Sequence, residues 1–165
     1  MKRVVVLFVL LLILCSCGSE KKIPSLESYP ITLSGNLSYN GNSYAVTSVI
    51  HGPHSADITI DYPENLSGYS FKVDNSSVWV YYDSMQIELK NGIADIPFAL
   101  IPEMLSVSYS DFESCRTEGD ALIYYYKKDG SLIRINTKRN EDKPCRIEYT
   151  GEQGTVIFDI ESFIA

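Results

Sequence analysis

Residues 31–50 read Ile-Thr-Leu-Ser-Gly-Asn-Leu-Ser-Tyr-Asn-Gly-Asn-Ser-Tyr-Ala-Val-Thr-Ser-Val-Ile, and this stretch decides the fold class. Apolar and polar residues alternate with a period of two on both sides of Asn40-Gly41. Such alternation is typical of antiparallel strands that bury one face. Asn-Gly is the preferred pair for a two-residue type I′ turn. The stretch therefore predicts a β-hairpin.

The same alternation recurs along the rest of the chain, and Asp83-Ser84 and Asp129-Gly130 supply further turns. In these segments the charged residues fall on the face opposite the apolar ones. The pattern predicts about ten strands, which besides residues 31–39 and 44–50 cover residues 56–62, 69–73, 78–82, 85–90, 121–128, 131–139, 145–150 and 154–161.

One helical stretch is predicted in the domain, at Pro97 to Ser106, where Phe98, Ile101 and Leu105 fall on one face. Pro102 interrupts it, because proline suits the first turn of a helix and not its interior. We expect two short turns or a kinked helix. With so little helix, the sequence predicts a mainly β domain, a curled half-barrel sheet, with a closed barrel and a β-sandwich as alternatives.

The N-terminus begins with Lys2 and Arg3, followed by 11 apolar residues at 4–14. This matches a secretory signal and is too short to span a membrane. The following Leu14-Cys15-Ser16-Cys17 resembles the lipobox of bacterial lipoproteins. The resemblance implies cleavage after Ser16 and acylation of Cys17. We expect a signal peptide at 1–16, a lipid anchor and tether at 17–29, and one antiparallel β domain at 30–165, on the extracytoplasmic face of the cell membrane.

The charge of the chain is −7, with no basic run outside the N-terminus, which argues against a nucleic-acid partner. Removal of residues 1–16 leaves 12 basic and 21 acidic residues, a charge of −9. An anionic membrane surface repels such a domain, so attachment would depend on the acyl chains at Cys17.

Two cysteines, Cys115 and Cys145, remain after the cut and the anchor are accounted for. An even number in an exported domain permits a disulfide. Two buried free thiols are the alternative, because cysteine is readily buried. Neither cysteine lies in a CxxC or metal-ligand spacing.

The residues that usually carry catalysis are scarce. Both histidines, His51 and His54, lie in one turn, and no motif for a nucleophile or for phosphate binding is present. The run Tyr124 to Tyr126 is typical of an ordinary strand, with its middle ring on one face and its outer rings on the other. We therefore predict no enzyme activity, no metal site and no cofactor.

The order of elements resembles the outer-membrane lipoprotein carrier superfamily (LolA, LolB and LppX types): an acylated cysteine, a six-strand meander, a proline-bearing helical stretch and a four-strand meander ending Val156-Ile-Phe-Asp159. The resemblance covers about residues 30 to 165 and implies a half-barrel whose concave apolar face holds lipid or acyl chains under helices. This chain has fewer helices than the carriers.

These observations predict a lipoprotein that binds or carries an apolar ligand such as a lipid or acyl chain, or a lipoprotein. The alternative is an interaction or structural module of the cell envelope without a small-molecule ligand. We call four residues the roof residues: Phe98, Ile101, Met104 and Leu105. If the protein is a carrier, its ligand would lie under them. If it is an interaction module, they are part of the core.

Overall fold

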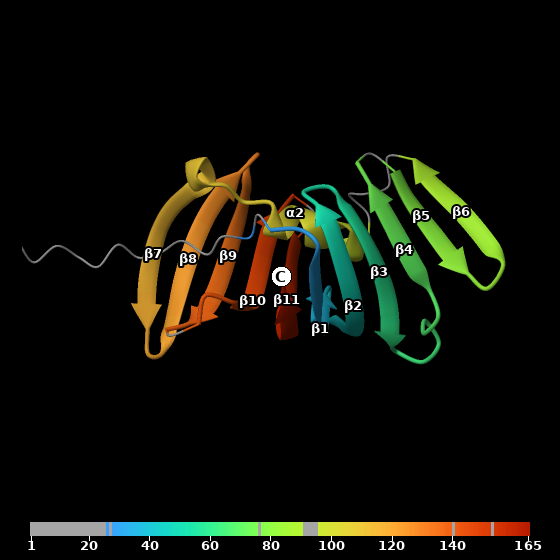
Figure 1. The fold of residues 1–165 in the computed structure, drawn as a ribbon, viewed down its shortest axis with the longest axis horizontal. Helices are drawn as coiled ribbons and strands as arrows, with labels where there is room; N and C mark the ends of the chain where they lie inside the picture. The colour runs from blue at the N-terminus through green and yellow to red at the C-terminus, as the bar shows by residue number, and fades with distance from the viewer. Residues whose placement is uncertain (1–25, 27, 76, 91–95, 140, 153) are drawn as a thin grey trace, which may run out of the picture.

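The computed structural model describes residue 26 and residues 28–75, 77–90, 96–139, 141–152 and 154–165. Within them, one antiparallel sheet has the order β6-β5-β4-β3-β2-β1-β11-β10-β9-β8-β7 (Figure 1). The strands are β1 (Ile31–Tyr39), β2 (Asn42–Gly52), β3 (Ser55–Tyr62), β4 (Ser70–Asp74), β5 (Ser77–Tyr82), β6 (Met85–Lys90), β7 (Phe112–Glu118), β8 (Ala121–Lys128), β9 (Ser131–Lys138), β10 (Pro144–Gly151) and β11 (Gly154–Ile164).

The sheet is open. Strands β6 and β7 lie at its opposite ends and do not pair with each other (Figure 1). The predicted half-barrel is thus confirmed, and neither a closed barrel nor a two-sheet sandwich forms. Two meanders, β1 to β6 and β7 to β11, meet at the antiparallel pair of β1 and β11 in the middle of the sheet.

Two of the turns predicted from sequence join paired strands as expected. Asn40 and Gly41 have φ values of 49° and 78°, and Asp129 and Gly130 have 48° and 84°. Both central residues of each turn are therefore left-handed, as a type I′ turn requires. Asparagine, aspartate and glycine adopt this conformation at low cost, which explains why the strands end there.

Most buried apolar side chains lie on one face of the sheet, and Ile123 is an exception on the other. We call the inner face the one that carries most of the buried apolar residues, and the outer face the other. Strand register aligns apolar residues in rows across the inner face, because directly paired residues point to the same side. One row crosses seven strands through Cys115, Tyr124, Ile135, Ile147, Phe158, Leu37 and Tyr44.

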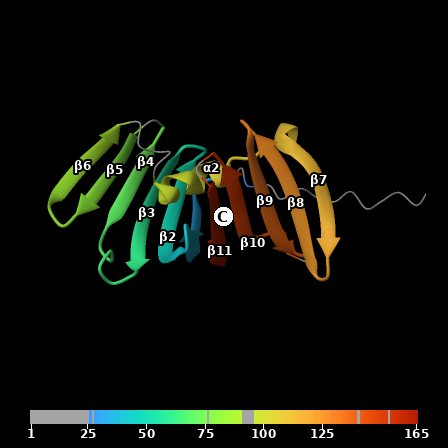
Figure 2. The same ribbon diagram turned by 180° about the vertical axis from the view of Figure 1, so that it is seen from behind.

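Two short helices lie over the middle strands, η2 (Pro97–Leu100) and α2 (Ile101–Leu105) (Figure 2). Each has a proline in its first turn, so Pro102 begins the second helix instead of breaking a longer one. The predicted pair of short turns is confirmed. In the described parts of the chain, no helix is long and apolar enough to cross a membrane.

Strand β7 is the one described strand that lies outside the ranges predicted from sequence. Its residues are mostly exposed on both faces, and only Phe112 and Cys115 pack against the core. An edge strand has a neighbour on one side only, so polar residues can occupy both faces. The hydrophobic alternation that indicates a half-buried strand is therefore absent there.

Candidate functional site

The four predicted roof residues lie in the core. Phe98 is 6% exposed, and Ile101, Met104 and Leu105 are each 1% exposed. The ring of Phe98 packs edge-on against Tyr44 at 5.0 Å between centroids and against Phe71 at 5.2 Å. A side chain with almost no exposed area borders no water-sized void. These side chains therefore fill the space between the helices and the sheet.

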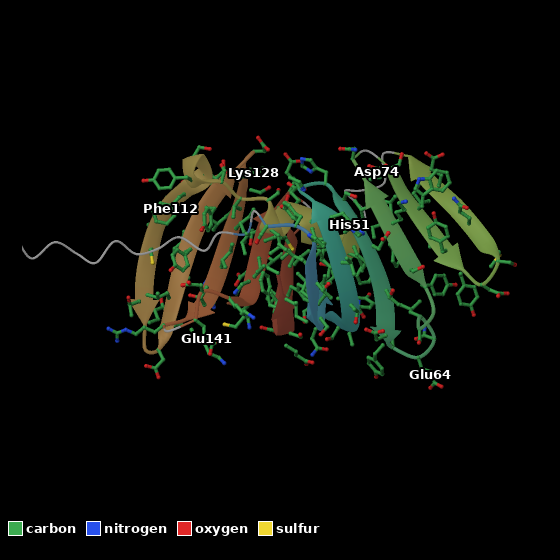
Figure 3. All side chains as sticks on the ribbon, in the orientation of Figure 1. His51, Glu64, Asp74, Phe112, Lys128 and Glu141 are labelled. Carbon is green, nitrogen blue, oxygen red and sulfur yellow. The ribbon has the colours of Figure 1, made fainter. Side chains whose placement is uncertain are left out.

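The segment after α2 is tied to strand β8. The ammonium of Lys128 donates to the carbonyl oxygen of Ser106 at 3.0 Å and contacts its hydroxyl at 2.8 Å. Figure 3 shows Lys128 on the β7–β9 side of the molecule. The Ser106 hydroxyl in turn donates to the carbonyl oxygen of Glu103 at 2.9 Å. These bonds hold the end of α2 in place on the inner face.

A capping box opens the next short helix, η3 (Tyr109–Asp111). The backbone N–H of Ser108 donates to the Asp111 carboxylate at 2.9 Å, and the Ser108 hydroxyl donates to it at 2.7 Å. These two bonds, the backbone one first, hold the pKa of Asp111 below its usual range. The turn that leads into β7 is thus held by a charged hydrogen bond.

The inner face of β8 to β10 carries several hydroxyl groups. Tyr149 and Ser131 share a hydrogen bond of 2.8 Å. Tyr126 is 1% exposed, and its hydroxyl has no hydrogen-bond partner among the described residues. Burial raises the pKa of Tyr126 and of Tyr124 above the ordinary tyrosine value. As predicted, Tyr124 and Tyr126 pair along the inner rows and Tyr125 points outward.

The opposite end of the sheet leaves apolar side chains exposed. Met85 and Ile87 of β6 are 57% and 55% exposed. By register, Ile87 lies in the inner row that includes Val80 and Phe71. Tyr82, which pairs with Met85, stacks on Tyr69 with 4.3 Å between ring centroids. We call Tyr82, Met85 and Ile87 the β6 patch.

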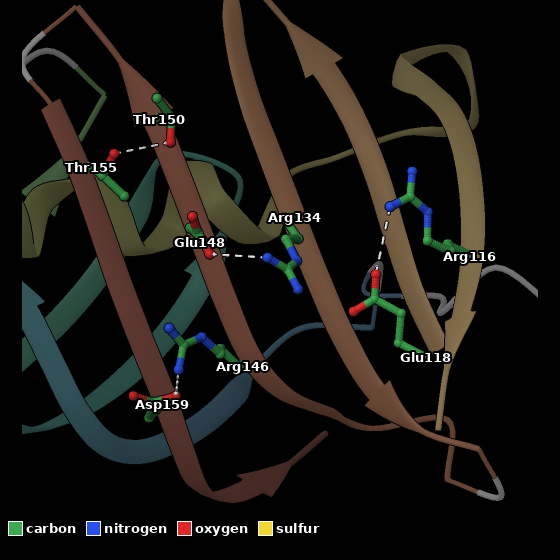
Figure 4. A network of polar contacts seen from close by, with 8 residues as sticks. All are labelled: Arg116, Glu118, Arg134, Arg146, Glu148, Thr150, Thr155 and Asp159. Atoms are coloured by element: carbon green, nitrogen blue, oxygen red, sulfur yellow. Dashed lines mark hydrogen bonds and ion pairs between the residues drawn. The ribbon is translucent and has the colours of Figure 1, made fainter. Parts of the chain in front are cut away.

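The outer face of β7 to β11 is covered by ion pairs (Figure 4). Each is partly exposed, so each contributes little stability on its own. Arg116 also lies over the ring of Tyr125, with 5.7 Å from guanidinium to centroid. The pairs are Arg146 with Asp159 at 3.1 Å, Arg134 with Glu148 at 3.7 Å and Arg116 with Glu118 at 3.6 Å.

Of the two alternatives that the sequence left open for Cys115 and Cys145, the structure has free thiols and no disulfide. Cys115 is on β7 and Cys145 is on β10, with β8 and β9 between them. Three strand spacings of about 4.8 Å separate them by about 14 Å, and a disulfide requires Cα atoms within about 7 Å. The Cys145 thiol instead donates to the carbonyl oxygen of Asn136 at 3.4 Å.

The sequence predicts no metal site and no catalytic site, and its two histidines lie as follows. His51 Nε2 contacts the Asp57 carboxylate at 2.9 Å on the exposed outer face. His54 lies in the turn before β3. In the part of the chain that the structure describes, no cluster of three histidine, cysteine or acidic residues could hold a metal ion. Cys17 and the segment 1–16 lie outside the described residues.

Sequence comparison finds no family model and no curated protein that matches the chain. Solved structures share the fold. An uncharacterized conserved protein from Thermus thermophilus has a TM-score of 0.51 at 10% identity, over 86% of this chain and 82% of that one. That likeness shows an open β half-barrel as the class of fold.

Two further solved structures resemble the chain more loosely. A LolA superfamily protein from Nitrosomonas europaea has a TM-score of 0.39 at 11% identity, over 84% of this chain and 86% of that one. An outer membrane lipoprotein-sorting protein domain from Vibrio parahaemolyticus has a TM-score of 0.43 at 8% identity, over 85% of this chain and 87% of that one.

Proposed function

We propose that this chain is a lipid-anchored lipoprotein of the extracytoplasmic membrane face, whose β domain binds a protein of the cell envelope. The observation that carries the proposal is the β6 patch. Met85 and Ile87 are more than half exposed, on the face of the sheet that carries the core farther from this edge. Folded proteins usually protect such an edge with charge or proline, so an apolar edge marks a contact surface.

The position of the β6 patch fits a partner that adds a strand. Among the described strands, β6 pairs with β5 alone, so its other edge presents backbone N–H and C=O groups. An added strand would satisfy these groups, and its apolar side chains would cover Met85 and Ile87. The packing beneath α2 supports the same proposal, because the four roof residues are almost fully covered.

Site-specific photo-crosslinking in the source bacterium tests this proposal. A crosslinking residue at Ile87 should form one discrete protein adduct, whereas the same residue at Gln86 on the outer face of β6 should form none. Competition with purified domain should remove the adduct, and competition with the Ile87→Asp domain should not. Equal adducts from positions 86 and 87 would contradict the proposal. Circular dichroism checks that Ile87→Asp folds, as expected for an exposed position.

Lipid carriage is the second candidate function, and the composition of the inner face favours it. Most residues of the inner rows are apolar, and the nine residues of η2 and α2 cover only their middle. Movement of these helices away from the sheet would expose Phe98, Ile101, Met104 and Leu105 to an acyl chain. Native mass spectrometry of the membrane-extracted protein decides between the candidates. A stoichiometric bound lipid, besides the acyl chains on Cys17, would favour the carrier.

A further inference from the structure

The outer face over β3, β4 and β5 contains a hollow of about 360 Å³. Its polar lining residues are Asp57, Thr59, Ser70, Lys72 and Tyr81. Strand register places all five on the outer face, since Asp57 pairs with Lys72, Thr59 with Ser70, and Ser70 with Tyr81. The volume falls within the range of small-molecule sites, about 300 to 1,000 Å³. This hollow lies on the opposite face from the β6 patch.

Most of the polar groups in this hollow are uncommitted. The side chains of Thr59, Ser70, Lys72 and Tyr81 make no hydrogen bond to other described residues. Asp57 is the exception, because His51 contacts its carboxylate at 2.9 Å and so fixes it at the rim. Three hydroxyls and one ammonium are therefore available for hydrogen bonds to a ligand. The hydroxyls can donate or accept, and the ammonium can donate.

The ring of Tyr81 lines the hollow on the side of β5, and Trp79 lies beside the lining residue Lys72. Trp79 and Tyr81 are two residues apart on this strand, so they share the outer face, and both are half-buried. Trp79 pairs directly with Lys72, which lines the hollow. The face of an aromatic ring is electron-rich and attracts the positively polarised C–H groups of a flat ring placed on it.

We propose that this hollow binds a neutral or N-acetylated oligosaccharide. A sugar ring presents an apolar C–H face to Trp79 and Tyr81 and a rim of hydroxyls to Thr59, Ser70, Lys72 and Asp57. A purely apolar ligand would leave four polar groups without partners, at a cost in binding. A polyanion would be attracted by Lys72 and repelled by Asp57 and the acidic chain around it. The chemistry of the hollow thus selects an uncharged, hydroxyl-rich ring.

Trp79 is the only tryptophan of the chain and lies beside the lining residue Lys72, so its fluorescence is a probe for binding at this hollow. The full chain, purified in a detergent without a sugar headgroup, is titrated with chitotriose, cellotriose and, as a polyanion, heparin. A saturable fluorescence change with a neutral trisaccharide is expected, and calorimetry detects binding that leaves the fluorescence unchanged. Tyr81→Ala should weaken binding by about tenfold. Tyr125→Ala, an outer-face tyrosine of the other meander, should not.

Circular dichroism verifies that Tyr81→Ala folds; if it does not, Lys72→Met and Thr59→Val, both exposed positions, replace it. Absence of binding to both neutral trisaccharides by fluorescence and calorimetry would overturn the proposal. Binding to heparin alone, or equal affinity in the wild type and the hollow variants, would overturn it as well. Ile87→Asp should retain oligosaccharide binding, so this result is independent of the protein-binding function proposed above.

Discussion

Among individual residues, Tyr126 has a buried hydroxyl group that lowers the stability of the folded protein. Its ring contributes to the core and packs edge-on against Phe112 at 5.8 Å, but its hydroxyl has no partner among the described residues. A buried donor without a partner costs stability, since it loses its hydrogen bonds to water on folding. The hydroxyl of Tyr149, on the same inner face, differs because Ser131 is its partner.

Tyr126→Phe is expected to raise the free energy of unfolding by about 1 kcal/mol, because it removes the unpaired hydroxyl and keeps the ring. Tyr149→Phe is the matched control and should lower it by about 1 kcal/mol, because Ser131 then loses its partner. Urea unfolding measures both. A Tyr126→Phe protein less stable than the wild type would show that the hydroxyl is hydrogen-bonded in solution.

The same variant has an expected pH dependence. Burial raises the pKa of the Tyr126 hydroxyl in the folded state above its ordinary value of 10.0. Above pH 10 this hydroxyl therefore stays protonated in the folded protein, whereas it is deprotonated in the unfolded chain. The stability from this residue is complete below pH 10 and falls as pH rises above it. Between about pH 9 and 11, the urea midpoint of the wild type should therefore fall more steeply than that of Tyr126→Phe.

At the scale of elements, the pairing of β1 with β11 joins the two meanders. The register shifts between Ser34 and Gly35, so the strands carry a β-bulge there. A Cβ atom on Gly35 would overlap the carbonyl oxygen of Asp159 and lie 3.0 Å from the Cα of Ile160. The atoms in the way belong to the backbone, so they can move only if the strands separate. Glycine is required here by close approach of two backbones.

Gly35→Ala is accordingly expected to lower the free energy of unfolding by about 2 to 3 kcal/mol, as overpacking does elsewhere. Gly52→Ala, at the end of β2, is the control, because its Cβ would meet nothing within 4 Å. It should change stability by less than about 0.5 kcal/mol. Thermal unfolding of the two variants under one set of conditions provides the comparison. Equal melting temperatures would refute the role assigned to the bulge.

For the whole molecule, the proposed attachment to a membrane has to act against the charge of the domain. The chain after residue 16 has a charge of −9, which opposes adsorption to anionic lipid. Two or more acyl chains suffice for stable anchoring without help from the protein surface. Attachment should thus depend on one residue, Cys17.

Cys17→Ala is expected to block lipid labelling and to release the domain from membranes or leave its signal peptide uncut. Cys15→Ala is the control and should behave as wild type, since the predicted cut removes Cys15. Metabolic labelling with a fatty acid and membrane fractionation follow both variants. Mass spectrometry that finds an unmodified Cys17 in a membrane-attached chain would refute the anchor.

Local patterns in the sequence were sufficient to predict the strands with one buried face, the type I′ turn at Asn40-Gly41, the turn at Asp129-Gly130, and a pair of short turns or a kinked helix around Pro102. These features depend on neighbouring residues, through side-chain alternation and backbone preference. Strand β7 escaped prediction because its exposure at an edge is a property of the sheet and leaves no alternation in the strand itself.

Only the tertiary structure decided which strands are neighbours and which apolar side chains are covered. The pairing of β1 with β11 joins residues near the two ends of the domain, and no local pattern specifies such a contact. That strand order places β8 and β9 between Cys115 and Cys145 and leaves β6 with an open edge. The role of Ile101 likewise depends on packing, because one apolar pattern suits both a ligand site and a core. The volume between helix and sheet distinguishes them, and that volume is set by side chains from distant parts of the chain.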